Sequence, residues 1–371
     1  MKISKFFFKI TYIFLSLLFI TIALEVTLRF TLGPTITTAA KTLDSAETSS
    51  LYSAYSDEEL SEKLPYRHEY HGGKCTDYYE GYKRNTKLRW HPRYGFSGKT
   101  FDINCINNLF LKNTKNIVFF GGSTIQQAET PNYLTSIEYY TFESDLEKYR
   151  SINFGMSGAR ISNSLSIFLE YIPKIKNVDT AIFFDGINEF HSIKFGGDST
   201  HDFYWTAGVS QRIHNPPQFF LDVLSARSKL FEIIFINIFN FQNKRKNKDI
   251  IEENEIIKSA NEYLYRKNII KGVCKTYNIE CIFILQPNFY LTKNKNVSKH
   301  NQKINNFMKL NYPNNAQIMK SGYSIISKDK DILDFTNTYD DLEDTYFDDA
   351  HTNKIGSKVI GLKFKKILLV D

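Results

Sequence analysis

Four short apolar runs lie between residues 116 and 287, and they limit the possible folds of the chain more than any other feature of its sequence. Each run is uninterrupted and bounded by glycine or proline: "NIVFFGG", "RSINFG", "DTAIFFDG" and "ECIFILQP". Strands buried on both faces of a parallel sheet have this pattern. Helical stretches precede the third and fourth runs, "SNSLSIFLEYIPKIK" and "KSANEYLYRKNIIKGVCKTY". Alternation of strands and helices predicts an open α/β fold with a mostly parallel sheet.

Polar and glycine-rich loops follow the first three predicted strands. They read "GGST", "GMSGAR" and "DGINEF", and "FDDAHTNKIGSKVIG" follows near the C-terminus. Loops at the carboxyl ends of parallel strands meet at one edge of the sheet, where ligands bind. We therefore expect these loops to form one site.

The residues of these loops suit acyl transfer. Ser123 is a candidate nucleophile, and it needs a base because a hydroxyl is weakly nucleophilic at neutral pH. His351 is the candidate base, and Asp348 can orient its imidazole across one turn. The backbone amides of Ser123 and Gly158 and the side-chain amide of Asn188 are candidate oxyanion donors.

Each of these signals has an ordinary structural alternative. A "GGS" after a strand is commonly a turn, and Asp-x-x-His is commonly a helix cap. No phosphate-binding glycine motif is present, and the net charge of +7 comes from scattered lysines, so neither nucleotide nor nucleic-acid binding is expected. The loose spacing in "HEYHGGKC" has no fourth ligand nearby, and we do not expect a metal site there. The order and placement of all four loops favour catalysis.

The sequence from about Asn116 to Asp371 resembles the SGNH/GDSL hydrolases. The matching residues of the four family blocks are Gly121, Gly122 and Ser123, then Gly158, then Gly186, Ile187, Asn188 and Glu189, and finally Asp348 and His351. The resemblance implies a three-layer α/β/α flavodoxin-like sandwich that acts on ester or thioester bonds without metal or cofactor. Two residues depart from the family pattern, because Glu189 replaces the usual Asp and Gln127 replaces a frequent glycine.

The N-terminus predicts a membrane anchor over residues 1–33. Three lysines precede an uncharged run of 15 residues, Ile10 to Leu24, which fits an anchor or a signal peptide. We favour an uncleaved anchor, because small residues suited to cleavage come too late. The positive-inside rule then predicts a single-pass protein with a cytoplasmic N-terminus and an extracytoplasmic catalytic domain, in the periplasm or at the cell surface.

The remaining sequence divides into three parts. Residues 34–64 read as a polar stalk, 65–112 as an extension packed on the domain, and 113–371 as the hydrolase domain with an insertion at about 191–250. The apolar run at 229–241 is expected to pack on the domain, with membrane contact as the alternative. The cysteines can form the pairs Cys75 with Cys105 and Cys274 with Cys281, or remain buried thiols.

Three functions fit this sequence. The first is a membrane-anchored serine ester hydrolase, and the others are an O-acyltransferase with the same triad and a glycan-binding protein without catalysis. Glu25 with Arg29, "HPRYG" and "ILQP" resemble membrane-anchored family members, some of which act on acyl groups of cell-surface polysaccharides. The expected partners are therefore an acyl-ester substrate, such as an O-acetylated envelope polysaccharide, and the membrane. The sequence does not indicate an oligomeric state.

Overall fold

The computed structural model describes most of the predicted hydrolase domain and shorter parts of the rest. The described residues are 12–13, 15–16, 19–27, 68–69, 75–78, 99–126, 133–134, 137, 141–142, 148–156, 158–191, 193, 230, 252–293, 295, 298–346 and 348–368. The chain forms two compact units, residues 1–53 with 209–246 and residues 54–208 with 247–371. Within the first unit, the Leu230 N–H donates to Glu25 Oε2 at 2.9 Å.

A five-stranded parallel sheet forms the centre of the second unit. Its strands, in spatial order, are β6 (Tyr149–Asn153), β4 (Lys115–Gly121), β7 (Thr180–Asp185), β8 (Glu280–Leu285) and β9 (Ile332–Asp334). All four neighbouring pairs are parallel, which confirms the predicted sheet. In chain order this is the 2-1-3-4-5 arrangement of flavodoxin-like folds.

Aromatic side chains fill both faces of this sheet. Phe120, Phe183 and Phe283 are in register on adjacent strands, and their rings stack with centroids 4.9 and 5.0 Å apart. Phe119 points to the opposite face, where its ring stacks on Phe364 at 6.0 Å. Successive residues of a strand point to opposite faces, so a strand covered on both sides needs an uninterrupted apolar run.

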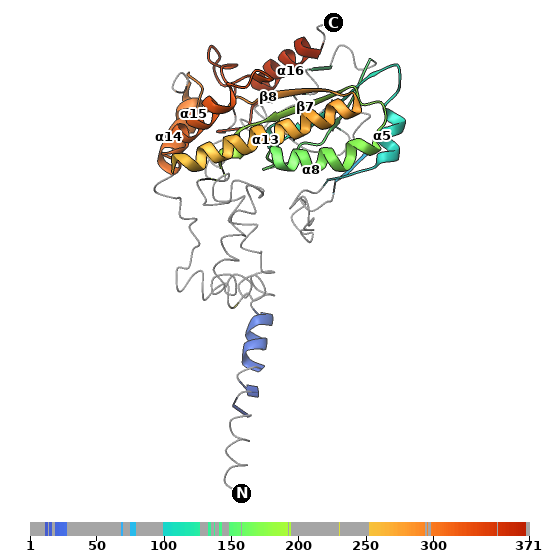
Figure 1. Ribbon diagram of the computed structural model, residues 1–371. Coiled ribbons are helices and arrows are strands. Elements are labelled where there is room, and N and C mark those ends of the chain that lie inside the picture. The colour runs from blue at the N-terminus through green and yellow to red at the C-terminus, as the bar shows by residue number, and fades with distance from the viewer. Residues whose placement is uncertain are drawn as a thin grey trace. The chain divides into compact units, whose positions relative to one another are not determined.

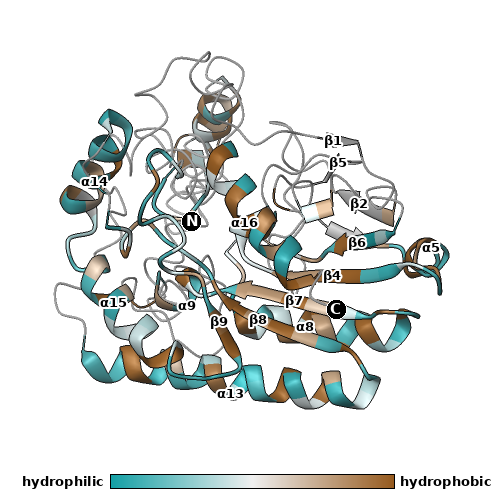
Figure 2. Ribbon diagram, turned by 90° about the horizontal axis from the view of Figure 1, so that it is seen from above, coloured by the Kyte–Doolittle hydropathy of each residue, from teal (hydrophilic) through white to brown (hydrophobic). Residues whose placement is uncertain are grey.

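Helices cover both faces and complete three layers (Figure 1). The helices α8 (Ile161–Tyr171) and α13 (Glu253–Tyr277) lie on one face, and α16 (Lys354–Leu368) lies on the other. Hydrophobic and hydrophilic residues alternate along α13, as expected of a helix with one buried side (Figure 2). The other described helices of this unit are α5 (Ile103–Leu109), α6 (Ser123–Gln126), η3 (Ile172–Lys174), α9 (Ile187–His191), α14 (Lys299–Asn311) and α15 (Asn315–Ile326).

Two small antiparallel sheets lie outside the central sheet. One pairs β1 (His68–Glu69) with β5 (Tyr133–Leu134), and the other pairs β2 (Thr76–Tyr78) with β3 (Lys99–Phe101). Helix α5 follows β3 directly, and its N-cap Asp102 accepts hydrogen bonds from the N–H groups of Asn104 and Cys105. The extension therefore contains regular structure that its irregular sequence did not indicate.

Both predicted cysteine pairs are disulfides. Cys75 bonds to Cys105 with their Cα atoms 5.2 Å apart, and Cys274 bonds to Cys281 at 6.2 Å. The first links the start of β2 to α5, and the second links the end of α13 to β8. The alternative of buried free thiols was wrong, since all four cysteines are paired.

The predicted membrane anchor falls only partly within the described residues. A helix is present at 19–27, but among the residues that the structure describes no helix is both long enough and apolar enough to cross a membrane. The polar stalk and the run at 229–241, except Leu230, lie outside the described residues.

We predict that the two disulfides differ in their contribution to stability. A disulfide restricts the unfolded chain more when its loop is longer, and the separations are 30 residues for Cys75–Cys105 and 7 for Cys274–Cys281. Chain entropy gives about 3.6 and about 2.4 kcal/mol respectively. Denaturant unfolding of the two double Cys→Ser variants measures both losses. An equal or larger loss for the short loop would contradict this ranking.

Candidate active site

Ser123 is presented by a glycine turn at the carboxyl end of β4. Gly121 ends the strand with φ at +150°, and a Cβ there would lie 2.3 Å from the Phe184 carbonyl oxygen. A Cβ on Gly122 would lie 2.3 Å from Asn188 Nδ2, so this close approach also favours glycine. Ser123 then begins α6, where the first N–H groups have no acceptor within the helix. The turn leaves the Ser123 side chain partly exposed at the sheet edge.

Ser123, His351 and Asp348 form a continuous chain of hydrogen bonds. His351 Nε2 lies 2.6 Å from Ser123 Oγ, and His351 Nδ1 lies 2.6 Å from Asp348 Oδ2. Asp348 is buried, whereas the His351 side chain remains 35% exposed. The structure thus brings together the three side chains that the sequence proposed as nucleophile, base and orienting carboxylate.

The loop that carries Asp348 and His351 is fixed by its own hydrogen bonds. Asp348 Oδ1 accepts from the N–H groups of Ala350 and His351 at 2.9 and 2.7 Å. The Asp349 carbonyl accepts from the Phe289 N–H at 2.9 Å, which ties the loop to the segment after β8. These bonds leave Asp348 Oδ2 directed at the imidazole.

The surroundings of His351 raise the pKa of its imidazole. Burial favours the neutral ring and opposes this change, but the charge and hydrogen bond of Asp348 outweigh it, with a smaller contribution from Asp349. The partial exposure of the ring limits the effect of burial. The resulting imidazole is more basic than a free one, as a proton acceptor for Ser123 requires.

The predicted oxyanion donors come from the ends of three adjacent strands. Ser123 follows β4, Gly158 follows β6 with φ at +69°, and Asn188 follows β7. Asn188 Nδ2 donates to the Ala159 carbonyl at 2.9 Å. A primary amide has two N–H groups, so this bond orients the side chain and leaves a second donor. The arrangement suits an anion beside Ser123.

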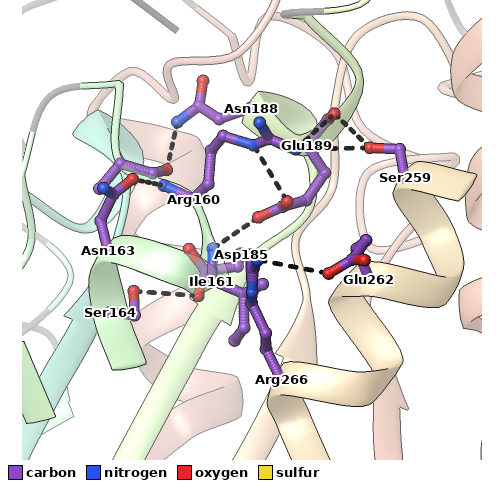
Figure 3. Close-up of polar contacts among 11 residues, drawn as sticks. Arg160, Ile161, Asn163, Ser164, Asp185, Asn188, Glu189, Ser259, Glu262 and Arg266 are labelled. Carbon is purple, nitrogen blue, oxygen red and sulfur yellow. Dashed lines mark hydrogen bonds and ion pairs between the residues drawn. The ribbon is translucent and has the colours of Figure 1, made fainter. Parts of the chain in front are cut away.

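A buried ionic cluster lies next to Asn188 (Figure 3). Glu189 Oε2 pairs with Arg160 Nε at 3.2 Å, and Glu189 Oε1 accepts the Ile161 N–H at 2.6 Å. Asp185 lies nearby and accepts from Ser164 Oγ at 3.4 Å. Burial, followed by repulsion from Glu189, raises the pKa of Asp185 well above its ordinary value.

The sequence analysis did not identify the supporting contacts of two residues, Gln286 and Asp349. Gln286, at the end of β8, donates to Thr124 Oγ1 beside the candidate nucleophile at 3.0 Å. Asp349 Oδ2 accepts from the Tyr290 hydroxyl at 2.8 Å and lies 3.3 Å from His191 Nε2. The signal available for Gln286 was a polar residue that directly follows an apolar strand. Gln127 lies outside the described residues, so its departure from the family pattern stays a prediction.

Among the described residues, no cluster of three or more His, Cys, Asp or Glu side chains has the arrangement of a metal site. Cys75 is bonded to Cys105 and is therefore not free to act as a ligand.

Comparison with known proteins gives structural matches alone. No protein-family model matches the sequence, and no curated protein matches it. Solved structures that match include Axe2, an acetylxylan esterase from Geobacillus stearothermophilus (12% identity, TM-score 0.35, covering 70% of this chain and 98% of that one). Others are the lipase Lip_vut3 from a goat rumen metagenome (10%, 0.38, 68% and 97%) and a protein described as a GDSL-like lipase from Parabacteroides merdae (10%, 0.37, 70% and 97%). All of these TM-scores are below 0.5, and the function of this protein is therefore argued from its own residues.

We predict that His351 titrates above the ordinary histidine value of 6.5, because Asp348 stabilises the imidazolium. Asp348→Asn removes that charge, so the His351 midpoint should fall below that of the unmodified protein. NMR of ¹⁵N-labelled histidine measures both midpoints, and His300→Gln tests the assignment of the signals. An unchanged midpoint in Asp348→Asn would contradict the electrostatic coupling.

Proposed function

We propose that this protein is a serine ester hydrolase in which Ser123 is the nucleophile, His351 the general base and Asp348 the orienting carboxylate. The observation that carries the proposal is the chain of two 2.6 Å hydrogen bonds from Ser123 through His351 to Asp348. These three residues are separated by up to 228 positions in sequence, so the fold, rather than local chain geometry, produces their contact.

The proposed reaction has two stages. His351 Nε2 accepts the proton of Ser123 Oγ as this oxygen attacks the ester carbonyl carbon. The tetrahedral intermediate collapses to an acyl-enzyme, and the leaving alkoxide takes the proton from the imidazolium. Water then loses a proton to His351 and attacks the acyl carbon, which releases the acid and returns the proton to Ser123.

The oxyanion of both intermediates requires preorganised donors. We assign this role to the backbone amides of Ser123 and Gly158 and to the second N–H of Asn188. Loss of one such donor typically slows kcat by about 10² to 10³. The bond from Asn188 to the Ala159 carbonyl supports the assignment, because an oriented amide needs little reorganisation during the reaction.

We extend the proposal to O-acyl esters, in particular O-acetyl esters of an envelope polysaccharide. The resemblance of Glu25 with Arg29, "HPRYG" and "ILQP" to membrane-anchored SGNH/GDSL members supports this choice. The same acyl-enzyme would serve an acyltransferase if a sugar hydroxyl replaced water, so that activity is the alternative outcome of the substrate test.

We also propose that residues 1–33 anchor the protein with its catalytic domain outside the cytoplasm. The lysine-flanked apolar run supports the anchor and its orientation. Apolar side chains on the described part of this segment are exposed, including Phe19, Ile20 and Ile22 at 73%, 59% and 53%. Two disulfides fit an oxidising compartment.

We predict that Ser123→Ala abolishes hydrolysis of a short-chain ester. Without its nucleophile the enzyme should lose roughly 10⁴-fold or more in kcat. Ser324→Ala is the matched control, since Ser324 is exposed on α15 and should leave turnover unchanged. Full residual activity in Ser123→Ala would refute the nucleophile.

Product analysis with an acetylated glycan tests the substrate. Free acetate is expected in water, and acetyl transfer to an added glycan acceptor would favour the acyltransferase. Glycan binding without Ser123-dependent release of acid would favour the non-catalytic alternative.

We predict that protease degrades the catalytic domain when it has access to the envelope but not to the cytoplasm. Immunoblotting against the domain follows its loss, and a cytoplasmic protein serves as the control. Full protection of the domain under these conditions would contradict the orientation of the anchor.

A further inference from the structure

The two loops that carry Gly158 and Asn188 are joined by consecutive hydrogen bonds. Asn188 binds the Ala159 carbonyl, and the next residue, Glu189, binds both the Arg160 side chain and the Ile161 N–H. Figure 3 shows Arg160 and Glu189 side by side, with Asn188 above them. Ala159, Arg160 and Ile161, the three residues after Gly158, are thus hydrogen-bonded to Asn188 and Glu189, two consecutive residues of α9.

Glu189 supplies an acceptor that the start of α8 lacks. Arg160 is the N-cap residue of this helix, and an arginine side chain has only donors. Glu189 Oε1 accepts the Ile161 N–H at 2.6 Å in its place. The negative charge of the Glu189 carboxylate is also stabilised at this position, because the N-terminus of a helix carries partial positive charge.

The Arg160–Glu189 pair is almost wholly inaccessible to solvent. The side chains are 1% and 3% exposed, and Ser259 Oγ of α13 donates to the Glu189 carbonyl at 2.8 Å. A buried charge is costly without its partner, so the guanidinium and the carboxylate hold each other in place.

We infer that Glu189 and Arg160 are positioning residues: their buried ion pair fixes the Gly158 loop against the Asn188 helix and so sets the separation of two oxyanion donors. This inference rests on the proposed function. It also gives Glu189 a role at the position where the SGNH/GDSL pattern has Asp, because the carboxylate must reach the guanidinium and the Ile161 N–H together.

The first test is Glu189→Gln. Glutamine can still accept the Ile161 N–H but presents a donor or a neutral oxygen to Arg160, so the two loops should separate. We expect kcat for the ester to fall by about 10-fold to 10²-fold, less than or equal to the effect of losing a donor outright. KM should change by less than about threefold, since the pair acts on the transition state. The acidic limb of the pH profile should not move, because His351 keeps Asp348.

Glu262→Gln is the matched control. It breaks a second Glu–Arg pair in the same region, Glu262 with Arg266 at 3.3 Å, in which both residues belong to α13. Its kcat should equal that of the unmodified protein. Wild-type kcat in Glu189→Gln would overturn the inference.

The double variant Arg160→Met with Glu189→Gln separates positioning from folding. It leaves no unpaired buried charge, so it should fold even if Glu189→Gln does not. A melting temperature near that of the unmodified protein with kcat still reduced about 10-fold or more supports positioning. Recovery of full kcat would overturn it, because the ion pair would then be dispensable.

A mutant cycle with Asn188→Ala gives the direct measure of coupling. If Glu189 acts through the oxyanion donors, the fall in kcat for Asn188→Ala with Glu189→Gln is smaller than the product of the two single falls. A fall equal to the product would mean independent action and would overturn the inference. Failure of the proposed function looks different, because the unmodified protein would then show no turnover that depends on Ser123.

Discussion

Burial of the central strands on both faces determines where this protein can place chemistry. All six residues of β7 are buried, and its polar residues, Thr180 and Asp185, occupy the two ends. A polar group in the middle of such a strand would have to find a partner inside an aromatic core, at a substantial cost in free energy. Reactive side chains are therefore confined to the loops at the strand ends. The strand order β6-β4-β7 then brings three of these loops together.

The site contains several charges with little access to water, and each has defined partners. The Asp348 carboxylate accepts two backbone N–H groups in addition to the His351 imidazole. Glu189 accepts one backbone N–H and pairs with Arg160. A fixed set of donors around each carboxylate keeps it in one orientation, and that is the property a preorganised site needs. The triad and the oxyanion donors thus depend on two separate polar networks, one beside β8 and one between α8 and α9.

The sequence predicted the parts of this architecture that are encoded locally. The strands at 115–121, 180–185 and 280–285 were expected within about two residues, because a doubly buried strand requires a continuous apolar run. β9 was missed, since it has three residues and two of them, Leu333 and Asp334, are exposed. The polar residues that follow the strands indicated the site, because the parallel topology alone makes the loops meet.

Contacts between distant loops could not be predicted in the same way. Glu189 was recognised as a departure from the family pattern, but nothing local to it identifies Arg160, 29 residues earlier, as its partner. The two disulfides were proposed as pairs and left open, because spacing does not report the distance between Cα atoms. In both cases the tertiary structure supplies the distance on which the interaction depends.

Covalent labelling of Ser123 is the most direct test of an activated serine at this edge of the sheet. The domain without residues 1–33 would be treated with a fluorophosphonate, and intact mass with peptide mapping would locate the adduct. The hydrogen-bonded chain predicts one adduct, on Ser123, that is lost in His351→Ala while Ser324→Ala still labels. A folded domain that does not label, or labels equally without His351, would contradict an activated nucleophile.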